Sequence, residues 1–407
     1  MPDKIRVALF SSEYPPHIFG GMGTHVVQVT SSLADSVTFE MFVPKRGDYQ
    51  ELHPAIRMHE VPVPRAQTNV EFWLRFCRNA VLVARQTMPS VDLIHCHDWM
   101  TVLAGLCLRE VLRVPLIANV HLPQTSVPTL HMENLGLVGA DLVLINSQAV
   151  REELVTRGLA IRRMSVVPNG VALTEFCPSP DWPLDDGYIL FVGRLAPQKG
   201  VDLLLRAFEV VLRRCPEGRL FIVGDGDLEL YFQRVTHYLG FPHRVSFVNW
   251  QTGPALVELY QKAQFVVMPS YYEPFGIVAL EAMACGRPIV ASRVGGLEEI
   301  IQDGVQGYLT PSGDHLQLAR RMADLMLNPE RRRRMGQAGR ERAAQFSWGK
   351  VGEATMSLYQ SLVGQAISPD PAQILDLRQE FLTSLEPRLQ AIAVSLFNGA
   401  TRHGKVI

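Results

Sequence analysis

The sequence predicts an α/β protein with two domains, each built on an open parallel sheet. Three observations support this fold class. Short apolar runs bounded by turn residues alternate with longer helical patterns along most of the chain. The runs form two series, each of a size that suits one open-sheet domain. A segment with four prolines and no periodicity, 168–187, separates the two series and is the expected linker.

The apolar runs are interpreted as buried strands, because parallel strands are covered on both faces and are hydrophobic throughout. In the first series the expected strands are 5–10, 39–43, 93–95, 116–120, 142–145 and 165–167. In the second series they are 188–192, 220–223, 245–248, 265–268 and 289–291. Open sheets of this kind bind ligands at the carboxyl ends of their strands, so the loops that follow these runs are where a site is expected.

The tail beyond Gln365 differs from the rest of the chain. The prolines of SPDPAQ end the preceding helical pattern. Apolar residues then recur at near-helical spacing, with Pro387 interrupting: Ile374, Phe381, Leu385, Leu389, Ile392 and Leu396. This pattern predicts one or two amphipathic helices. We expect them to pack on the body of the protein; packing on another subunit, as an oligomer contact, is the alternative.

The composition is that of an ordinary soluble globular protein. Of the 407 residues 47% are hydrophobic and 19% charged, and the net charge of -1 gives no support for nucleic-acid binding. The six cysteines are scattered without paired spacing, which fits a reduced, cytoplasmic compartment. The first apolar run is too short for a signal peptide, and no stretch reaches the roughly 18 apolar residues of a membrane span. The helical pattern 72–86 mixes aromatic residues with arginines, as membrane-surface helices do, but packing on its own sheet is favoured.

The loop after the first expected strand carries Gly20, Gly21 and Gly23, ahead of a helix that begins near His25. Glycines at a helix N-terminus let backbone amides approach an anion closely. The spacing is not the G-x-G-x-x-G of dinucleotide sites. A structural turn and a ligand cradle are equally compatible with this loop.

Two cations follow the first strand of the second series, in the segment GRLAPQKGVDLLLRAF. Arg194 and Lys199 lie on a loop that leads into a helix with a clear apolar face. At the carboxyl end of a strand such a pair could clamp a diphosphate. Solvated surface charges are an equally good interpretation of these two residues taken alone.

Two glutamates mark the segment SYYEPFGIVALEAMACGRPIVAS, 270–292. Residues 277–285 are apolar on every side, which predicts a helix buried all round and ended by Gly286. Glu281 lies in the middle of that helix, and Glu273 precedes it by eight residues. A carboxylate among apolar neighbours needs a partner, so the helix raises the question of what Glu281 faces.

Histidines end two strands of the first series. HCHDW places His95, His97 and Asp98 at one strand end, and His121 follows the next strand. The His95-x-His97 spacing could suggest a metal site, but hydrogen-bonded histidines are favoured because no further ligand cluster is evident in the sequence. The acidic pairs Asp185–Asp186 and Asp225/Asp227 read as turn residues as readily as metal carboxylates. We therefore expect no metal.

Taken in order, these motifs resemble the retaining glycosyltransferases of family 4. The resemblance covers about residues 5–363 and rests on GGMGTHV, HCHDW, NVHL, VVPNGV, FVGRLAPQKGVDLLLRAF, IVGDGD and PSYYEPFGIVALEAMACGRPIVAS. It implies the GT-B fold, two Rossmann-like domains facing a cleft. The implied boundaries are an N-terminal acceptor-side domain over 1–170, a C-terminal nucleotide-sugar domain over 171–345, a crossover helix over 346–363 that packs back on the first domain, and a helical extension over 366–407.

The resemblance also implies roles for individual residues. Arg194 and Lys199 match the basic pair that holds the diphosphate of the donor. Glu273 matches the glutamate that contacts the transferred sugar, and Glu281 the one that binds the ribose. The remaining matches are the backbone over the phosphates (Phe275, Gly276 and Ile277), the N-domain loop that closes on the donor (Gly20 and Gly21) and the histidine near the sugar (His121). The family works without a metal, and no cofactor is implied.

The sequence departs from the family pattern in two places. Asn249–Trp250 follow the strand 245–248 where relatives often carry a glycine. The resemblance therefore does not determine which base the nucleotide carries. The segment after His121 is short, so the acceptor does not carry over from relatives. HCHDW and SSEYPP resemble the glycogen- and starch-synthase-like branch, which favours UDP- or ADP-glucose as the donor and a hydroxyl of a glycan or small molecule as the acceptor. The alternatives are a sugar phosphorylase on the same scaffold and a non-catalytic binding protein with this fold.

Overall fold

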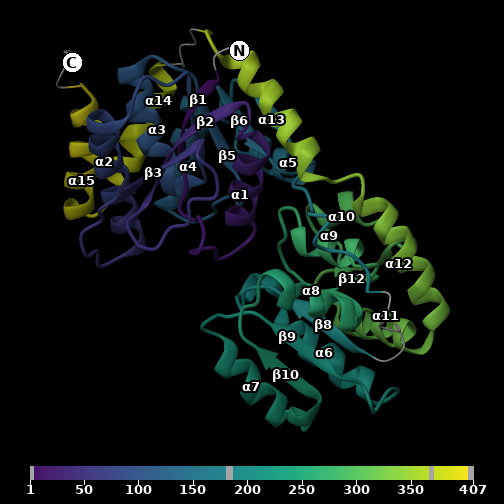
Figure 1. The fold of residues 1–407 in the computed structure, drawn as a ribbon. Helices are drawn as coiled ribbons and strands as arrows, with labels where there is room; N and C mark the ends of the chain where they lie inside the picture. Colours follow the sequence, from purple (N-terminus) through teal and green to yellow (C-terminus); the bar gives the residue numbers. More distant parts are fainter. Residues whose placement is uncertain (1–3, 180–186, 366–370, 402–407) are drawn as a thin grey trace. The chain divides into compact units, whose positions relative to one another are not determined.

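The computed structural model describes residues 4–179, 187–365 and 371–401, which belong to two compact units (Figure 1). The first unit contains the residues up to Val167 and those from Val351 onward. The second unit is the continuous segment Pro168–Lys350. Each unit contains one sheet in which every paired strand is parallel to its neighbour, so the predicted α/β class with two parallel sheets is confirmed.

The sheet of the first unit has seven strands in the order β3-β2-β1-β4-β5-β6-β7. They are β1 (Ile5–Phe10), β2 (Val37–Pro44), β3 (Ile56–Val61), β4 (Leu93–His97), β5 (Leu116–Val120), β6 (Leu142–Ile145) and β7 (Met164–Val166). The sequence did not predict β3. This strand lies at the edge of the sheet, where its exposed Arg57 and half-buried Glu60 interrupt the apolar pattern that marks the central strands.

Five helices join these strands: α1 (Gly21–Leu33), α2 (Asn69–Thr87), α3 (Trp99–Leu112), α4 (Thr129–Gly139) and α5 (Gln148–Thr156). Helix α2 contains the pattern that was weighed as a membrane-surface helix. Its residues Trp73, Phe76 and Cys77 are buried in the hydrophobic core, and the helix packs against α3. The aromatic side of α2 is therefore covered by protein, as favoured from the sequence.

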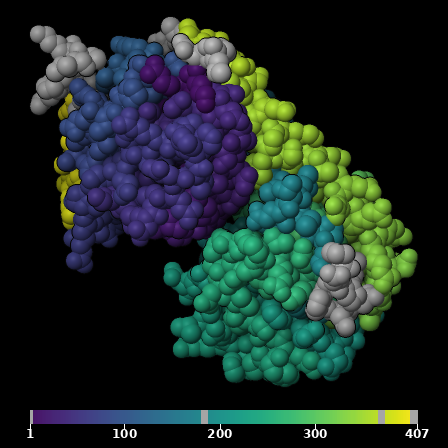
Figure 2. Space-filling view, in the orientation of Figure 1, coloured from purple at the N-terminus to yellow at the C-terminus, as the bar shows by residue number. Residues whose placement is uncertain are grey.

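The tail forms two helices, α14 (Pro371–Thr383) and α15 (Pro387–Thr401). Helix α14 packs on α4, and α15 packs on α2 and α3. Phe381, Leu385, Leu389 and Leu396 are buried in the core of the first unit. In the space-filling view the yellow segment that contains these helices lies against the blue and purple surface of that unit (Figure 2). The apolar stripe of the tail thus packs on the body of the protein, as predicted, and Pro387 opens the second helix.

The sheet of the second unit has six strands in the order β10-β9-β8-β11-β12-β13. They are β8 (Tyr188–Val192), β9 (Leu220–Val223), β10 (Val245–Val248), β11 (Ala263–Met268), β12 (Ile289–Ser292) and β13 (Gly307–Thr310). The sequence did not predict β13, because this edge strand is four residues long and begins with glycine. The helices that connect these strands are η1 (Pro197–Lys199), α6 (Val201–Leu212), α7 (Glu229–Tyr238), η2 (Pro242–Arg244), α8 (Gly253–Lys262), α9 (Ile277–Ala284) and α10 (Leu297–Ile300). Two further helices, α11 (His315–Leu327) and α12 (Pro329–Ala343), follow the last strand.

Helix α13 (Trp348–Leu362) begins in the second unit and belongs to the first from Val351 onward. Its Tyr359 is fully buried, and the hydroxyl of this residue lies 2.7 Å from Nδ1 of His95 on β4. One hydrogen bond thereby joins two residues of the first unit that are 264 positions apart in the chain.

Both sheets change direction at their first strand. Strand β1 lies between β2 and β4, and β8 lies between β9 and β11. In open parallel sheets ligands bind beside this switch point, at the carboxyl ends of the two strands that flank it. The loops after β1, β4, β8 and β11 are therefore the positions that the topology selects for a site.

Among the described residues, no helix is both long and apolar enough to cross a membrane.

Candidate functional site

Lys199 and Glu273 form an ion pair at the switch point of the second unit. Nζ of Lys199 lies 2.7 Å from Oε2 of Glu273. The lysine comes from the loop after β8 and the glutamate from the loop after β11, and these two strands pair in parallel. Ser270 donates a second hydrogen bond to the same carboxylate oxygen, at 3.2 Å. The Glu273 side chain is only 9% exposed, so its position is fixed by these contacts.

A close approach between the two loops holds Lys199 against Glu273. The backbone N–H of Tyr271 donates to the carbonyl of Gln198, the residue before Lys199, at 2.8 Å. Gly200 follows with φ +67°, and a Cβ there would lie 2.1 Å from the carbonyl oxygen of Pro269. Only glycine combines this backbone conformation with this separation. The ion pair therefore depends on a glycine that the sequence pattern QKG places directly after the lysine.

Arg194 leaves the same strand end. It follows β8 by two residues and is exposed, and its carbonyl accepts a hydrogen bond from the N–H of Ala196. The loop thus presents one guanidinium and one ammonium at the carboxyl end of β8. Both are groups that bind phosphate oxygens.

Helix α9 begins in the loop after β11. Gly276 precedes its first residue with φ +107°, and Phe275 is buried. The first amides of the helix, beginning at Ile277, lie at its N-terminus, where the partial positive charge favours an anion. The segment from Phe275 to Ile277 thus supplies backbone donors a few residues after Glu273.

Glu281 lies on α9 and finds its partner on the preceding helix. The hydroxyl of Tyr260 on α8 donates to Oε2 of Glu281 at 2.7 Å, and Tyr260 is fully buried. Burial raises the pKa of Glu281 to about 7, and the hydrogen bond from Tyr260 offsets part of that rise. The charge that the sequence leaves unexplained is therefore paired with a neutral hydroxyl rather than with a cation. No sequence motif pointed to Tyr260; only its place one helix upstream could have suggested it.

In the first unit, the glycine loop after β1 ends at the start of α1. Helix α1 begins at Gly21, and Gly20 precedes it in an extended conformation with φ 173°. The backbone N–H of Phe19 donates to Oε2 of Glu13 at 2.8 Å, which ties the loop back to the end of β1. The loop is thus a turn held by a side-chain hydrogen bond at a helix N-terminus, next to the switch point of the first sheet.

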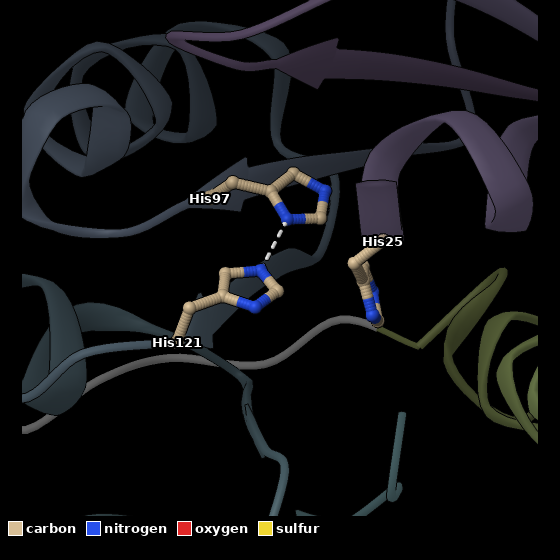
Figure 3. Close-up of side chains that lie close together, drawn as sticks. All are labelled: His25, His97 and His121. Atoms are coloured by element: carbon tan, nitrogen blue, oxygen red, sulfur yellow. Dashed lines mark hydrogen bonds between the residues drawn. The ribbon is translucent and has the colours of Figure 1, made fainter. Parts of the chain in front are cut away.

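Histidines from three elements meet at the same end of the first sheet. His97 ends β4, His121 follows β5 and His25 lies on α1, and their side chains face one another (Figure 3). Nδ1 of His97 lies 3.0 Å from Nε2 of His121, the bond drawn as a dashed line in Figure 3. The rings of His25 and His121 meet edge to face at a centroid distance of 4.7 Å. His97 also stacks on His95, whose Nδ1 is bonded to Tyr359.

Burial keeps His97 and His121 neutral. It lowers the pKa of His97 and of His121 well below the ordinary 6.5, and neighbouring histidines lower both further. Burial also raises the pKa of Asp98 to about 8, although Oδ1 of Asp98 accepts a 2.6 Å hydrogen bond from the backbone N–H of His121. His121 is therefore a neutral imidazole whose main chain is fixed by Asp98.

The same three histidines could hold a metal ion. One ring nitrogen from each of His25, His97 and His121 lies within 4.8 Å of the others. Three imidazoles are a donor set that zinc accepts. The expectation that no further ligand cluster accompanies His97 is therefore wrong. Because β4 and β5 are parallel neighbours, the histidines at their carboxyl ends had to meet, and the sequence pattern contained that signal.

The structure describes only one of the two acidic pairs that the sequence singled out. Asp185 and Asp186 lie outside the described residues. Oδ1 of Asp225 accepts a hydrogen bond from the backbone N–H of Trp250 at 2.9 Å, and the carbonyl of Asp225 accepts from Leu195. Asp225 thus connects the loops after β8, β9 and β10.

Two family models match the chain. Residues 19–175 match glycosyltransferase family 4, and residues 174–342 match the glycosyl transferases group 1. An uncharacterized glycosyltransferase of Methanocaldococcus jannaschii is 33% identical, over 74% of this chain and 84% of its own length. A D-inositol 3-phosphate glycosyltransferase of Kribbella flavida is 32% identical, over 84% of this chain and 91% of its own length.

Solved structures share the fold. Sucrose-phosphate synthase from Thermosynechococcus elongatus aligns with a TM-score of 0.79 at 27% identity, covering 88% of this chain and 99% of its own. The HepE protein of Anabaena, in complex with UDP and glucose, aligns with a TM-score of 0.75 at 22% identity, covering 88% of this chain and all of its own (100%).

Proposed function

Because the chain belongs to the glycosyltransferases of family 4 and has their GT-B fold, we propose that it moves a sugar from a nucleotide diphospho-sugar to a hydroxyl group of an acceptor, with retention of configuration at the anomeric carbon. The observation that carries this proposal is the ion pair of Lys199 and Glu273 at the switch point of the second sheet. It places a cation for the diphosphate within 2.7 Å of a carboxylate for the sugar.

The residues of the second unit are proposed to bind the donor. Lys199 and Arg194 hold the diphosphate, together with the first amides of α9 around Phe275, Gly276 and Ile277. Glu273 accepts a hydrogen bond from a hydroxyl of the transferred sugar. Glu281 binds the ribose hydroxyls. In the first unit, Gly20 and Gly21 close on the donor and His121 contacts the sugar.

The proposed transfer breaks the bond between the anomeric carbon and the diphosphate oxygen, and it forms a bond from that carbon to the acceptor oxygen on the same face. The proton of the acceptor hydroxyl passes to the departing diphosphate. Negative charge grows on the diphosphate in the transition state, so fixed cations and amides directed at it accelerate the step by about a hundredfold each. Lys199 and Arg194 supply this charge in the protein itself, and we propose that no metal is needed.

Glucose from UDP-glucose is the donor we favour, with ADP-glucose as the alternative. A complex of HepE with UDP-glucose, on the same fold, supports this choice. The acceptor is a glycan or a small molecule. The names of the inositol 3-phosphate glycosyltransferases and of sucrose-phosphate synthase support a small molecule that carries a phosphate. We place the protein in the cytoplasm because all six cysteines are free thiols.

Isothermal titration with UDP, ADP, GDP and inorganic phosphate tests the proposal, followed by nucleotide release from a panel of nucleotide sugars. We expect tight binding of one nucleoside diphosphate and slow hydrolysis of the matching sugar without an acceptor. Tight binding of phosphate alone would favour a phosphorylase. A protein that binds no nucleotide and hydrolyses no donor would be a non-catalytic member of the fold.

A further inference from the structure

The buried histidines of the first unit must divide their protons among fixed hydrogen bonds. Each neutral imidazole has one N–H and one lone pair. In the bond between Nδ1 of His97 and Nε2 of His121, one nitrogen therefore donates and the other accepts. The contacts of the other ring nitrogens determine which of the two is the donor.

The second ring nitrogen of His97 determines the direction of the hydrogen bond between His97 and His121. Nε2 of His97 is buried and has no hydrogen-bond partner among the described residues. A buried N–H without an acceptor is rarer in proteins than a buried acceptor that lacks a donor. The proton of His97 therefore belongs on Nδ1, which is bonded, and not on Nε2. It follows that Nδ1 of His97 donates and Nε2 of His121 accepts.

The other contacts hold His121 in place for this bond. Its backbone N–H donates to Asp98 at 2.6 Å, and its carbonyl accepts from the side chain of Asn146 at 3.4 Å. The rings of His25 and His121 meet edge to face. Nε2 of His25 lies 3.2 Å from the amide nitrogen of Asn119, which can only donate, so this nitrogen of His25 carries no proton.

We propose that His97 is a positioning residue that fixes His121 in the Nδ1–H tautomer, so that His121 offers an N–H donor to an oxygen of the bound sugar. In Figure 3 the other ring nitrogen of His121, Nδ1, lies on the side of the ring away from His97. Only the identity of the ligand rests on the proposed function. The tautomer itself follows from contacts within the first unit.

The first test reads the tautomer without any substrate. Long-range ¹H–¹⁵N spectra of the full chain labelled with ¹⁵N-histidine distinguish protonated from bare ring nitrogens, and the His121→Asn variant assigns the signals. We expect the proton of His121 on Nδ1. A proton on Nε2 of His121 overturns the proposal, whatever the protein transfers.

The second test compares two substitutions at His97. In His97→Asn the side-chain amide N–H takes the place of Nδ1–H, so the donor to His121 is kept. In His97→Leu the donor is lost. We expect His97→Leu to lower kcat by about 10- to 100-fold with the donor KM within about twofold, and His97→Asn to restore most of kcat. Equal losses in the two variants would show a packing role only and overturn the proposal.

The two tests separate the possible failures. If the wild-type protein transfers no sugar, the proposed function fails, and the spectra still decide the tautomer. If His97→Leu does not fold, the spectra of the wild-type protein and of His97→Asn decide it.

Discussion

The hydroxyl of Tyr260 donates a 2.7 Å hydrogen bond to Glu281 inside the second unit. The pair answers why a carboxyl group is tolerated in the apolar helix α9. It also predicts a dependence of stability on pH, because burial raises the pKa of Glu281 to about 7 from an ordinary 4.5.

Between about pH 4.5 and 7 the folded protein keeps a proton on Glu281 that the unfolded chain releases. The free energy of unfolding should therefore fall as the pH rises through this window, by about 3 kcal/mol at 1.36 kcal/mol per pKa unit. Glu281→Gln removes the effect, so the difference between the wild type and this variant, measured by urea unfolding, should change over the same window. In Tyr260→Phe the pKa of Glu281 should rise further, since the bond that favours the carboxylate is lost. A difference that stays constant from pH 4.5 to 7.5 would contradict the raised pKa of Glu281.

Replacing Lys199 by alanine should lower kcat/KM for sugar transfer by about a hundredfold or more, because the growing charge on the diphosphate loses a fixed cation. The protein should remain folded, with a circular dichroism spectrum like that of the wild type. Arg213→Ala is the matched control, since Arg213 is a largely exposed cation of the same unit. A Lys199→Ala variant with the kcat/KM of the wild type would contradict the proposal that Lys199 binds the diphosphate.

Gly200→Ala should disrupt the contact between the loops after β8 and β11. The new Cβ would lie 2.1 Å from the carbonyl oxygen of Pro269, so the loop must move and carry Lys199 away from Glu273. We expect a loss of transfer activity of about tenfold or more together with a lower Tm.

Gly158→Ala provides the control for backbone strain, because Gly158 has the same φ of +67° but nothing within 4 Å of a Cβ. Its cost should be about 1 kcal/mol with activity intact. Equal effects of the two substitutions would mean that strain alone, and not the contact with Pro269, matters at Gly200.

Removal of divalent metals by EDTA should leave transfer activity unchanged, since Lys199 and Arg194 supply the positive charge at the diphosphate. The histidine cluster makes the experiment informative. If EDTA abolishes activity and Zn²⁺ restores it in the wild type but not in His25→Ala, a functional metal lies on His25, His97 and His121.

Phe381→Ala should destabilise the first unit by about 3–5 kcal/mol, because Phe381 is fully buried in its core. Leu375→Ala, on the same helix, should change stability by no more than about 0.5 kcal/mol, since Leu375 is 61% exposed. Thermal unfolding of the two variants measures both values. A mild effect of Phe381→Ala would mean that the tail is bound only loosely to the body.

Truncation after Gln365 tests the tail as a whole. Because α14 and α15 cover α2, α3 and α4, we expect the shortened chain to aggregate or to unfold at a lower temperature. A stable truncated protein whose solution mass drops from an oligomer to a monomer would instead assign the tail to subunit contacts.

The strands in the middle of both sheets could be predicted because burial on two faces leaves a continuous apolar run. The edge strands β3 and β13 could not, since Arg57 in one and the short GYLT sequence of the other weaken that signal. Lys199 and Glu273 were recognisable singly as candidates, but their contact depends on the pairing of β8 with β11. The hydrogen bond from Tyr260 to Glu281 depends on how α8 packs, which no local pattern encodes.

The bond between His95 and Tyr359 has a consequence for synthesis of the chain. The second unit is continuous in sequence and can fold once Lys350 has left the ribosome. The first unit cannot bury His95, or complete its core with Leu396, until the end of the chain has been made. The half of the molecule that is translated first is therefore the half that matures last. Its core must remain incomplete while more than 180 residues of the other unit, Pro168–Lys350, are synthesised.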